Sequence, residues 1–367
     1  MPLEIIFNEP YTQWDWKIAQ YVALIGLAGG AYLTAYVADV LSKRRESVEH
    51  GQLAKYGYLT GLLVIAISPP IMLSHLATPF RAMALPFTMS NLGSWMAIGS
   101  YLIAGFGLGA LLMFGWTAFG KERPNRPAVA DGGTDIASDG GTAETATGGR
   151  TVGGGVRGVA NRVGLLDLLD RLADITRPSE KIRLGLGAFF GVLAAGVLLY
   201  SAMALGSGAT NRVPLWDKTF LIPVQILSGL GAGLAAAVGL TALATRSPGR
   251  TLQSYALAAS GLLVGSLLAV LATVTMLPGQ APAAAEAVNN MLTTYAGLFI
   301  GVAIVGGMVL PAIFLGGSAL AQRSGALPDD VTAASYVFAG ALAVAGKIAL
   351  ALVYILAAEF TPLPLPM

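Results

Sequence analysis

Histidine and cysteine, the residues that most often hold redox centres, are scarce in this sequence. The chain has no cysteine, and its two histidines are His50 and His75. Without cysteine there are no thiolate ligands for an iron–sulfur cluster. The helices predicted below place His50 and His75 on opposite sides of a membrane, whereas a bis-histidine haem needs both ligands at one depth. The sequence therefore predicts no haem, iron–sulfur cluster or other metal centre in this chain.

Two ionisable residues lie in or at the end of long apolar segments. Asp39 lies near the end of the first such segment, and Lys347 lies inside the last one. A charge within a membrane helix is costly, so such residues are candidates for function, here for a proton path. We expect Asp39 to be solvated at the inner end of its helix. Lys347 is expected to pair internally, to reach the outer interface or to carry protons.

Eight predicted transmembrane helices position these residues. Hydrophobic residues make up 55% of the 367 residues and charged residues only 11%, against about 25% charged in soluble domains. A spanning helix needs roughly 20 apolar residues. The predicted spans cover residues 18–41, 56–74, 94–119, 184–206, 219–245, 252–277, 292–319 and 332–357. The fold class we predict is an all-α polytopic membrane protein.

The basic residues outside the spans predict the orientation. Seventeen of them fall on one side, including Lys43, Arg44, Arg45 and Lys55, and only four, Lys17, Arg81, Arg212 and Lys218, fall on the other. The positive-inside rule assigns the richer side to the cytoplasm. Both termini then lie on the outer side, which requires an even number of spans. The net charge of +2 is explained by a membrane surface and does not indicate nucleic-acid binding.

The predicted organisation has four parts. Residues 1–119 hold the first three spans, 120–183 form a cytoplasmic segment, 184–206 the fourth span and 207–367 a second four-helix bundle. The cytoplasmic segment contains a Gly-rich linker (131–155) and then an amphipathic helix (163–175) that suits the membrane surface.

A tryptophan followed by a glycine stripe occurs twice in the chain. Trp16 precedes Gly26, Gly29 and Gly30, and Trp216 precedes Gly229, Gly231 and Gly233. Glycine stripes let membrane helices approach closely. The repetition favours two four-helix bundles related as parallel repeats, with both tryptophans in an outer aromatic belt.

Several motifs, in order and at consistent membrane depth, resemble the NrfD family, which includes the membrane subunit of polysulfide reductase. The resemblance covers about residues 10–245 without the Gly-rich insert. It rests on Gly-Leu-Ala-Gly-Gly at 26–30, His-Leu-Ala-Thr-Pro-Phe-Arg at 75–81, Thr-Met-Ser-Asn-Leu-Gly-Ser-Trp at 88–95, the segment 200–205 and Pro-Leu-Trp-Asp at 214–217.

The resemblance implies a fold and a function. Family members have eight helices in two four-helix bundles and bind a quinone, here a menaquinone or a related one, near the outer face. They exchange electrons with a subunit that carries four iron–sulfur clusters, which serves a catalytic subunit, often a molybdopterin enzyme, on the same face. The chain would then be a respiratory-chain subunit of the cytoplasmic membrane that supports quinol oxidation or quinone reduction without a redox centre of its own.

The resemblance also assigns the quinone pocket. The residues that match it are Gln20, Tyr21, His75, Thr78, Arg81 and Tyr200. His75 and Tyr200 are the expected catalytic groups, because tyrosine and histidine can each donate and accept a proton. The chain departs from the family at two positions: His75 stands where an Asp is usual, and Ile18 replaces a polar residue.

Plainer roles remain open for the same residues. His75 could cap the backbone of a loop, Tyr200 could belong to the aromatic belt, and Gln20 and Tyr21 could pack between helices. Arg81 could hold its loop or pair with an outer carboxylate such as Asp15 or Asp217.

Two other classes of protein are also open. A secondary transporter could use Pro69-Pro70 and Pro311 as breaks in its helices, but it would want polar groups near the midplane. A purely structural anchor would need no polar pocket. The clustering of polar residues at the outer edge favours the quinone-interacting subunit.

Overall fold

The computed structural model describes residues 15–75, 94–119, 156–206 and 213–359. Contacts divide the chain into two compact units, one formed by Met1–Phe114 with Pro178–Met367 (unit 1) and one by Gly115–Arg177 (unit 2). Over the described ranges every regular element is helical, and eight helices are long and apolar enough to cross a membrane. The predicted all-α polytopic class is therefore confirmed.

The first four long helices are α1 (Trp16–Arg45), α2 (Val48–His75), α5 (Trp95–Ala118) and α8 (Glu180–Met203). The last four are α9 (Lys218–Thr245), α10 (Arg250–Met276), the π-helix η4 (Gly297–Val309) that continues into α12 (Leu310–Arg323), and α13 (Asp329–Leu356). Short helices join them: η2 (Pro214–Trp216), η3 (Leu277–Gly279) and α11 (Pro282–Leu292). None of these three short helices was predicted.

The first predicted loop, between residues 41 and 56, is almost entirely helical. Only Glu46 and Ser47 separate α1 from α2, and Lys55 lies on α2. Glu46 caps α1 with a φ of 49°, in the left-handed region, and its N–H bonds to the carbonyl oxygen of Ser42. Hydropathy marks only the apolar part of a helix, while the backbone bonds continue into the polar ends. The prediction therefore made both helices too short.

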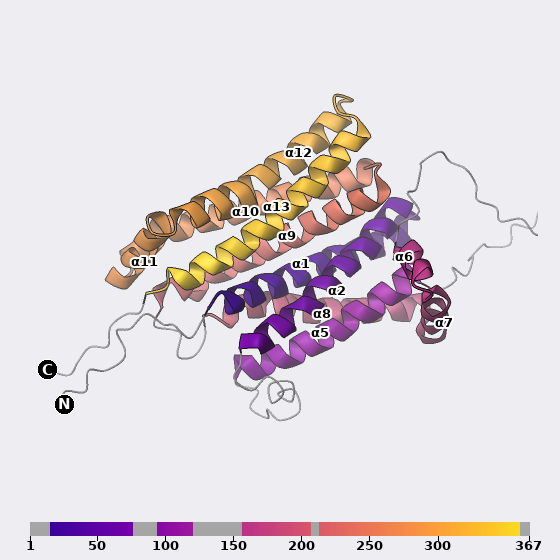
Figure 1. Ribbon diagram of the computed structural model, residues 1–367, viewed down its shortest axis with the longest axis horizontal. Helices are drawn as coiled ribbons and strands as arrows, with labels where there is room; N and C mark the ends of the chain where they lie inside the picture. The colour runs from indigo at the N-terminus through magenta and orange to yellow at the C-terminus, as the bar shows by residue number, and fades with distance from the viewer. Residues whose placement is uncertain (1–14, 76–93, 120–155, 207–212, 360–367) are drawn as a thin grey trace, which may run out of the picture. The chain divides into compact units, whose positions relative to one another are not determined.

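Close helix contacts join the first and last groups of helices in unit 1 (Figure 1). Helix α1 packs against α2 and α8 and also against α9 and α13. A Cβ on Gly30 would overlap the carbonyl oxygen of Gly229, and a Cβ on Gly233 would overlap the backbone of α1 at Ala31. Gly30 of the first stripe and Gly229 and Gly233 of the second thus meet between the helices, which lets α1 and α9 lie almost in backbone contact.

Pro69 and Pro70 lie inside α2, which continues through both of them to His75. Pro311 lies in the first turn of α12, directly after the π-helix, so the helix continues there too. A proline removes one backbone donor and crowds the carbonyl four residues earlier, which wider turns can relieve. The breaks that a transporter would use are therefore not gaps in these helices.

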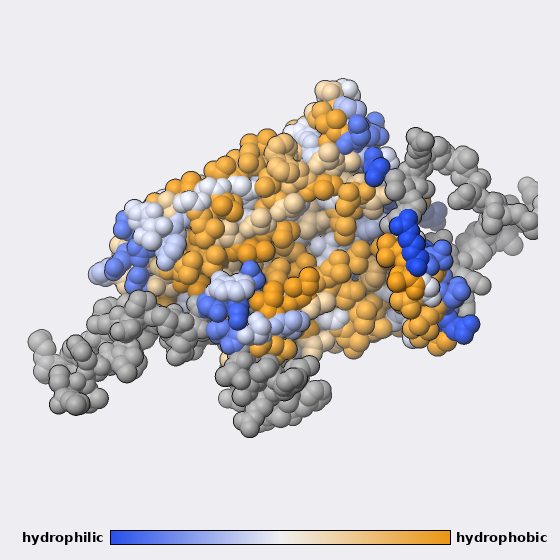
Figure 2. Space-filling model, in the orientation of Figure 1, coloured by the Kyte–Doolittle hydropathy of each residue, from blue (hydrophilic) through white to orange (hydrophobic). Residues whose placement is uncertain are grey.

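The two ends of unit 1 are named here for later use. The end at which α1 begins is the Asp15 end, and the end at which α1 finishes is the Arg45 end; α13 finishes at the Asp15 end (Figure 1). On the face in Figure 2, hydrophobic residues cover the middle of these helices and hydrophilic residues gather toward their ends. Assignment of the Arg45 end to the cytoplasm stays a prediction of the positive-inside rule.

Unit 2 contains α6 (Val156–Arg162), which was not predicted, and α7 (Leu166–Thr176), which matches the predicted amphipathic helix. Arg157 on α6 pairs with Asp170 on α7 at 2.5 Å. Large apolar side chains stand exposed in and beside α7 at helical spacing: Leu165, Leu168, Leu172 and Ile175. Such a stripe suits a membrane surface.

The two tryptophans of the predicted aromatic belt differ in burial. Trp16 is 53% exposed at the start of α1. Trp216 is only 2% exposed, and its indole Nε1 donates to the carbonyl oxygen of Tyr354 on α13 at 2.7 Å. The prediction of a belt position for Trp216 is wrong, because η2 turns this residue inward against the last helix.

Candidate functional site

Two buried tyrosines, from α1 and α8, meet toward the Asp15 end. Tyr21 and Tyr200 are each 6% exposed, and their hydroxyl groups lie close enough to each other to interact. A Cβ on Gly99 of α5 would overlap the ring of Tyr200, so glycine makes room for this ring. Ser68 of α2 donates to the carbonyl oxygen of Tyr21 at 3.5 Å. All four of the first long helices therefore shape the surroundings of this pair.

The tyrosine pair has hydrogen-bonding capacity left over. Two phenol groups carry two protons, and a bond between them would use only one. The second proton can go to an outside acceptor, and the oxygens still have free lone pairs. Gln20 precedes Tyr21 on α1 and is half-buried. This donor and acceptor set fits the ring oxygens of a quinone, which accept hydrogen bonds when oxidised and donate them when reduced.

His75 lies at the very end of α2 and pairs with Asp15 at the start of α1. The distance from His75 Nδ1 to Asp15 Oδ1 is 3.3 Å, and the side chains are 24% and 35% exposed. Asp15 also caps α1 by accepting from the N–H of Lys17 at 2.9 Å. Burial opposes ionisation of Asp15, but the Lys17 N–H and the adjacent His75 lower the pKa of its carboxyl group below its usual value.

The predicted pocket residues fall into separate places. Tyr21 and Tyr200 are in contact, whereas among the described residues His75 is paired with Asp15, about 9 Å nearer the helix end by helix rise. Thr78 and Arg81 lie outside the described residues. From the sequence, Asp15 was proposed only as a partner for Arg81. The position of Asp15 directly before the first span is nevertheless typical of a helix N-cap.

Lys347 on α13 is buried between helices, with 2% exposure. Its ammonium group donates to Gln225 Oε1 at 2.5 Å and to Ser228 Oγ at 2.7 Å, both on α9. Of the alternatives considered for Lys347, the structure shows internal pairing, with uncharged partners. Neither Gln225 nor Ser228 was predicted from the sequence as a partner of Lys347. A signal was available, because Gln225 lies about 11 Å and Lys347 about 14 Å along its helix from the Asp15 end, which places the two at similar depth.

The lysine cluster lies close to the helices that carry the tyrosine pair. A Cβ on Gly26 would stand 3.3 Å from Ser201 Oγ and 3.7 Å from Lys347 Cε. Gly26 is five residues after Tyr21 on α1, and Ser201 directly follows Tyr200 on α8. Lys347 is thus about one and a half helical turns deeper than the tyrosines.

Asp39 is buried, so the prediction that it is solvated is wrong. It is 3% exposed, and its two oxygens accept from the guanidinium of Arg183 on α8 at 2.6 and 2.8 Å. Tyr58 of α2 also donates to Asp39, at 3.3 Å. Arg183 is the last residue of the predicted cytoplasmic segment 120–183, but α8 begins at Glu180 and brings the Arg183 side chain to the carboxylate.

The histidines are separated by the length of a helix. His50 lies near the start of α2 and His75 at its end, about 37 Å apart by helix rise. They cannot ligate one iron within this chain. In the part of the chain that the structure describes, no three His, Cys, Asp or Glu side chains form a group that could hold a metal ion.

These features define a multi-pass α-helical membrane protein with a buried phenol pair near one end of its first four helices. The chain belongs to the polysulphide reductase NrfD family, whose model matches residues 4–358. The predicted resemblance is therefore confirmed and extends over nearly the whole chain. Among curated proteins, none matches it. The family and the eight candidate spans identify a multi-pass protein of the cell membrane.

Proposed function

We propose that this chain is the quinone-interacting membrane subunit of a multi-subunit respiratory oxidoreductase. The NrfD family to which it belongs is generally composed of such subunits. The observation that carries the proposal is the buried Tyr21–Tyr200 hydroxyl pair, a protonatable donor and acceptor set near one helix end. Menaquinone or a related quinone is the proposed ligand.

A bound quinone would supply two-electron, two-proton chemistry at this position. Tyr200 and Tyr21 would hold a ring oxygen through the phenol proton that a bond between them would leave free. Gln20 would add an amide that can donate and accept. Gly99 leaves room for the ring of Tyr200, because a side chain at this position would displace the ring.

His75 and Asp15 would exchange protons between the site and the water at the Asp15 end. Both are partly exposed and within 3.3 Å of each other, and both can bind and release protons. Protons would pass between the His75–Asp15 pair and the two tyrosines along the first turns of α1. Thr78 and Arg81, which follow His75 in the sequence, are proposed to complete this side of the pocket.

Electrons would pass directly between the quinone and a partner subunit. The chain has no cysteine, and its two histidines are too far apart to share a haem, so no redox centre is expected within it. The proposed partners are a four-cluster iron–sulfur subunit and a catalytic subunit of the molybdopterin class on the Asp15 side.

Of the two proton-path candidates, Lys347 is the one we retain. Its ammonium group has only uncharged partners and lies near Ser201 and Gly26, so it could take up or release a proton close to the tyrosines. Asp39 is held by two bonds from Arg183, which favours a structural role. A transporter would instead need these groups to line an open midplane cavity, and Lys347 is buried.

The test compares Tyr200→Phe and Tyr21→Phe with Tyr336→Phe in membranes that contain the assembled complex. Tyr336 is a matched control because it is fully buried on α13 and its hydroxyl has no partner in the described structure. Loss of one hydrogen bond to a ring oxygen costs about 1 kcal/mol, which corresponds to about fivefold weaker quinone binding. We expect this loss, and slower quinol-linked electron transfer, in the two site variants only.

A result in which Tyr200→Phe and Tyr21→Phe bind a menaquinone analogue and turn over as well as the control would overturn the site. His75→Ala should slow turnover without weakening quinone binding, because its proposed role is proton exchange. Purification of the chain without any iron–sulfur partner would contradict its assignment to a complex.

A further inference from the structure

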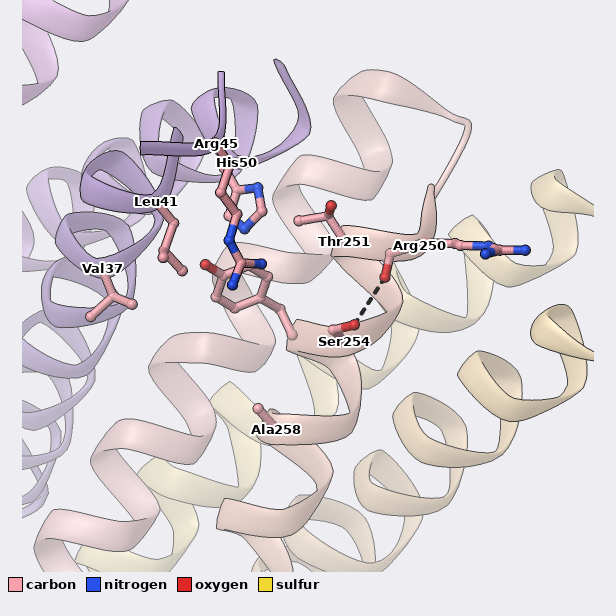
Figure 3. A pocket seen from close by; sticks show the side chains of 9 residues that line it. Val37, Leu41, Arg45, His50, Arg250, Thr251, Ser254 and Ala258 are labelled. Carbon is pink, nitrogen blue, oxygen red and sulfur yellow. Dashed lines mark hydrogen bonds between the residues drawn. The ribbon is translucent and has the colours of Figure 1, made fainter. Parts of the chain in front are cut away.

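A second polar site lies at the Arg45 end, far from the tyrosine pair. A pocket of about 380 Å³ opens there between the end of α1 and the starts of α2 and α10. Figure 3 shows Arg45 of α1 and His50 of α2 beside this pocket, with Thr251 and Ser254 of α10 across from them. From Tyr21 to Arg45 the rise of α1 is about 36 Å, so the pocket is separate from the proposed quinone site.

Two buried polar groups of the pocket have no protein partner. His50 is 5% exposed, and its Nδ1 atom has no hydrogen-bond partner among the described residues; the same holds for the hydroxyl of Tyr255. The two rings stand edge to face, with centroids 5.8 Å apart. Buried polar atoms are nearly always satisfied, so a pair of orphaned groups in one pocket indicates a ligand that satisfies them.

The charge beside these groups is positive. Arg45 is exposed and makes no ion pair with any described residue, and it is close enough to Tyr255 and His50 to act on both electrostatically. Glu49 also acts on His50 electrostatically, but its single charge accepts from the N–H of Thr251 at 2.9 Å, and Arg45 and Arg250 both line the pocket. The side chain of Arg250 points away from the others in Figure 3. The pocket therefore favours an anion.

The lining changes from polar to apolar along the helices. On α1, Arg45, Leu41 and Val37 follow at intervals of four residues, so they form one stripe that runs from the helix end toward its middle. On α10 the equivalent stripe runs from Thr251 to Ala258. Val37 is 52% exposed on the side of the helix bundle. A free anion would use only the polar end, whereas a lipid would use both.

We propose that this pocket binds the phosphate head group of an anionic phospholipid. Arg45 would contribute the charge, and His50 and Tyr255 would donate hydrogen bonds to phosphate oxygens. An acyl chain would lie along Leu41 and Val37. Basic pockets between helices at the inner membrane face bind such head groups, and the positive-inside rule predicts that the Arg45 end faces the inner leaflet.

The experiment uses the full chain, purified in its complex and placed in nanodiscs of phosphatidylcholine. Phosphatidylglycerol with the same acyl chains is titrated in, and lipid retained by the protein is counted by native mass spectrometry. We expect saturable retention of phosphatidylglycerol by the wild type. Arg45→Gln should weaken it about tenfold, and Tyr255→Phe about fivefold, while Arg44→Gln, which changes an exposed neighbour that does not line the pocket, should match the wild type.

Two further arms separate the alternatives. Inorganic phosphate should compete with phosphatidylglycerol only weakly, because it gains nothing from the apolar stripe; equal competition would show a free-anion site and overturn the lipid assignment. Equal loss in Arg44→Gln and Arg45→Gln would show diffuse attraction to the basic surface and would overturn the pocket. Quinone binding at the tyrosine pair, measured in the same samples, should be unchanged in all three variants.

Discussion

Breaking the buried ion pair between α1 and α8 should lower the free energy of unfolding of the chain strongly. Asp39 and Arg183 have side chains only 5% and 4% exposed and share two hydrogen bonds of 2.6 and 2.8 Å. Replacement of one member leaves the other charge buried without its partner, which costs about 3–5 kcal/mol. We therefore expect Asp39→Leu and Arg183→Met each to lower the free energy of unfolding by about that amount.

The double variant distinguishes a paired charge from two separate packing losses. Replacement of both members by apolar residues removes the desolvation cost of both charges, so it is often neutral or stabilising. We expect Asp39→Leu/Arg183→Met to be more stable than either single variant, with some loss from Tyr58, which then lacks its acceptor.

A second ion pair between the same two helices supplies the control. Lys43 and Glu180 are 4.0 Å apart and about half exposed, at 48% and 46%. Exposed pairs contribute about 0–1 kcal/mol, so their double-mutant cycle should show little coupling. The assay is equilibrium unfolding of the purified chain in detergent micelles by added dodecyl sulfate, followed by circular dichroism. Additive losses in the Asp39–Arg183 cycle, or coupling equal to that of Lys43–Glu180, would refute the reasoning.

Three other changes have defined outcomes. Gly30→Ala should cost about 1–3 kcal/mol, seen as a lower unfolding temperature, because its Cβ would overlap the backbone of Gly229; Gly107→Ala, with nothing within 4 Å of the added atom, should cost nothing. Lys347→Met should leave the yield of folded chain unchanged but flatten the pH profile of quinol-linked turnover, and an unchanged profile would remove Lys347 from the proton path. Because the folded pKa of Asp15 is lowered, its contribution to stability is complete above the unfolded pKa of about 3.9 and is lost as pH falls through the lower folded value. Unfolding temperatures of Asp15→Asn should therefore decline less steeply at acid pH than those of the wild type.

Hydropathy was sufficient for the number and positions of the membrane-spanning helices. Runs of apolar residues long enough to cross a bilayer have few alternatives to a spanning helix, because the backbone must satisfy its own hydrogen bonds there. All eight predicted spans correspond to helices in the structure. The motifs between residues 26 and 217, taken together and in order, also identified the family. Tyr21 and Tyr200 were both predicted for the pocket, and the structure brings them into contact.

Burial within the bundle could not be inferred in the same way. Hydropathy measures how a residue partitions into lipid, but whether its side chain faces lipid, water or another helix depends on the rotation and register of that helix. Asp39 meets Arg183 from 144 positions away in the chain, and Trp216 meets Tyr354 from 138. Both pairs exist only because the bundle brings their helices together.

The sequence by itself determined that the chain spans a membrane, how many times, and to which family it belongs, because the bilayer and the motifs act on local stretches of chain. The tertiary structure alone decided which polar groups are paired. It gave Lys347 two uncharged partners on α9, and it left His50 and Tyr255 together in a pocket at the Arg45 end. Those pairings depend on contacts between distant helices, which local hydrophobicity and spacing do not contain.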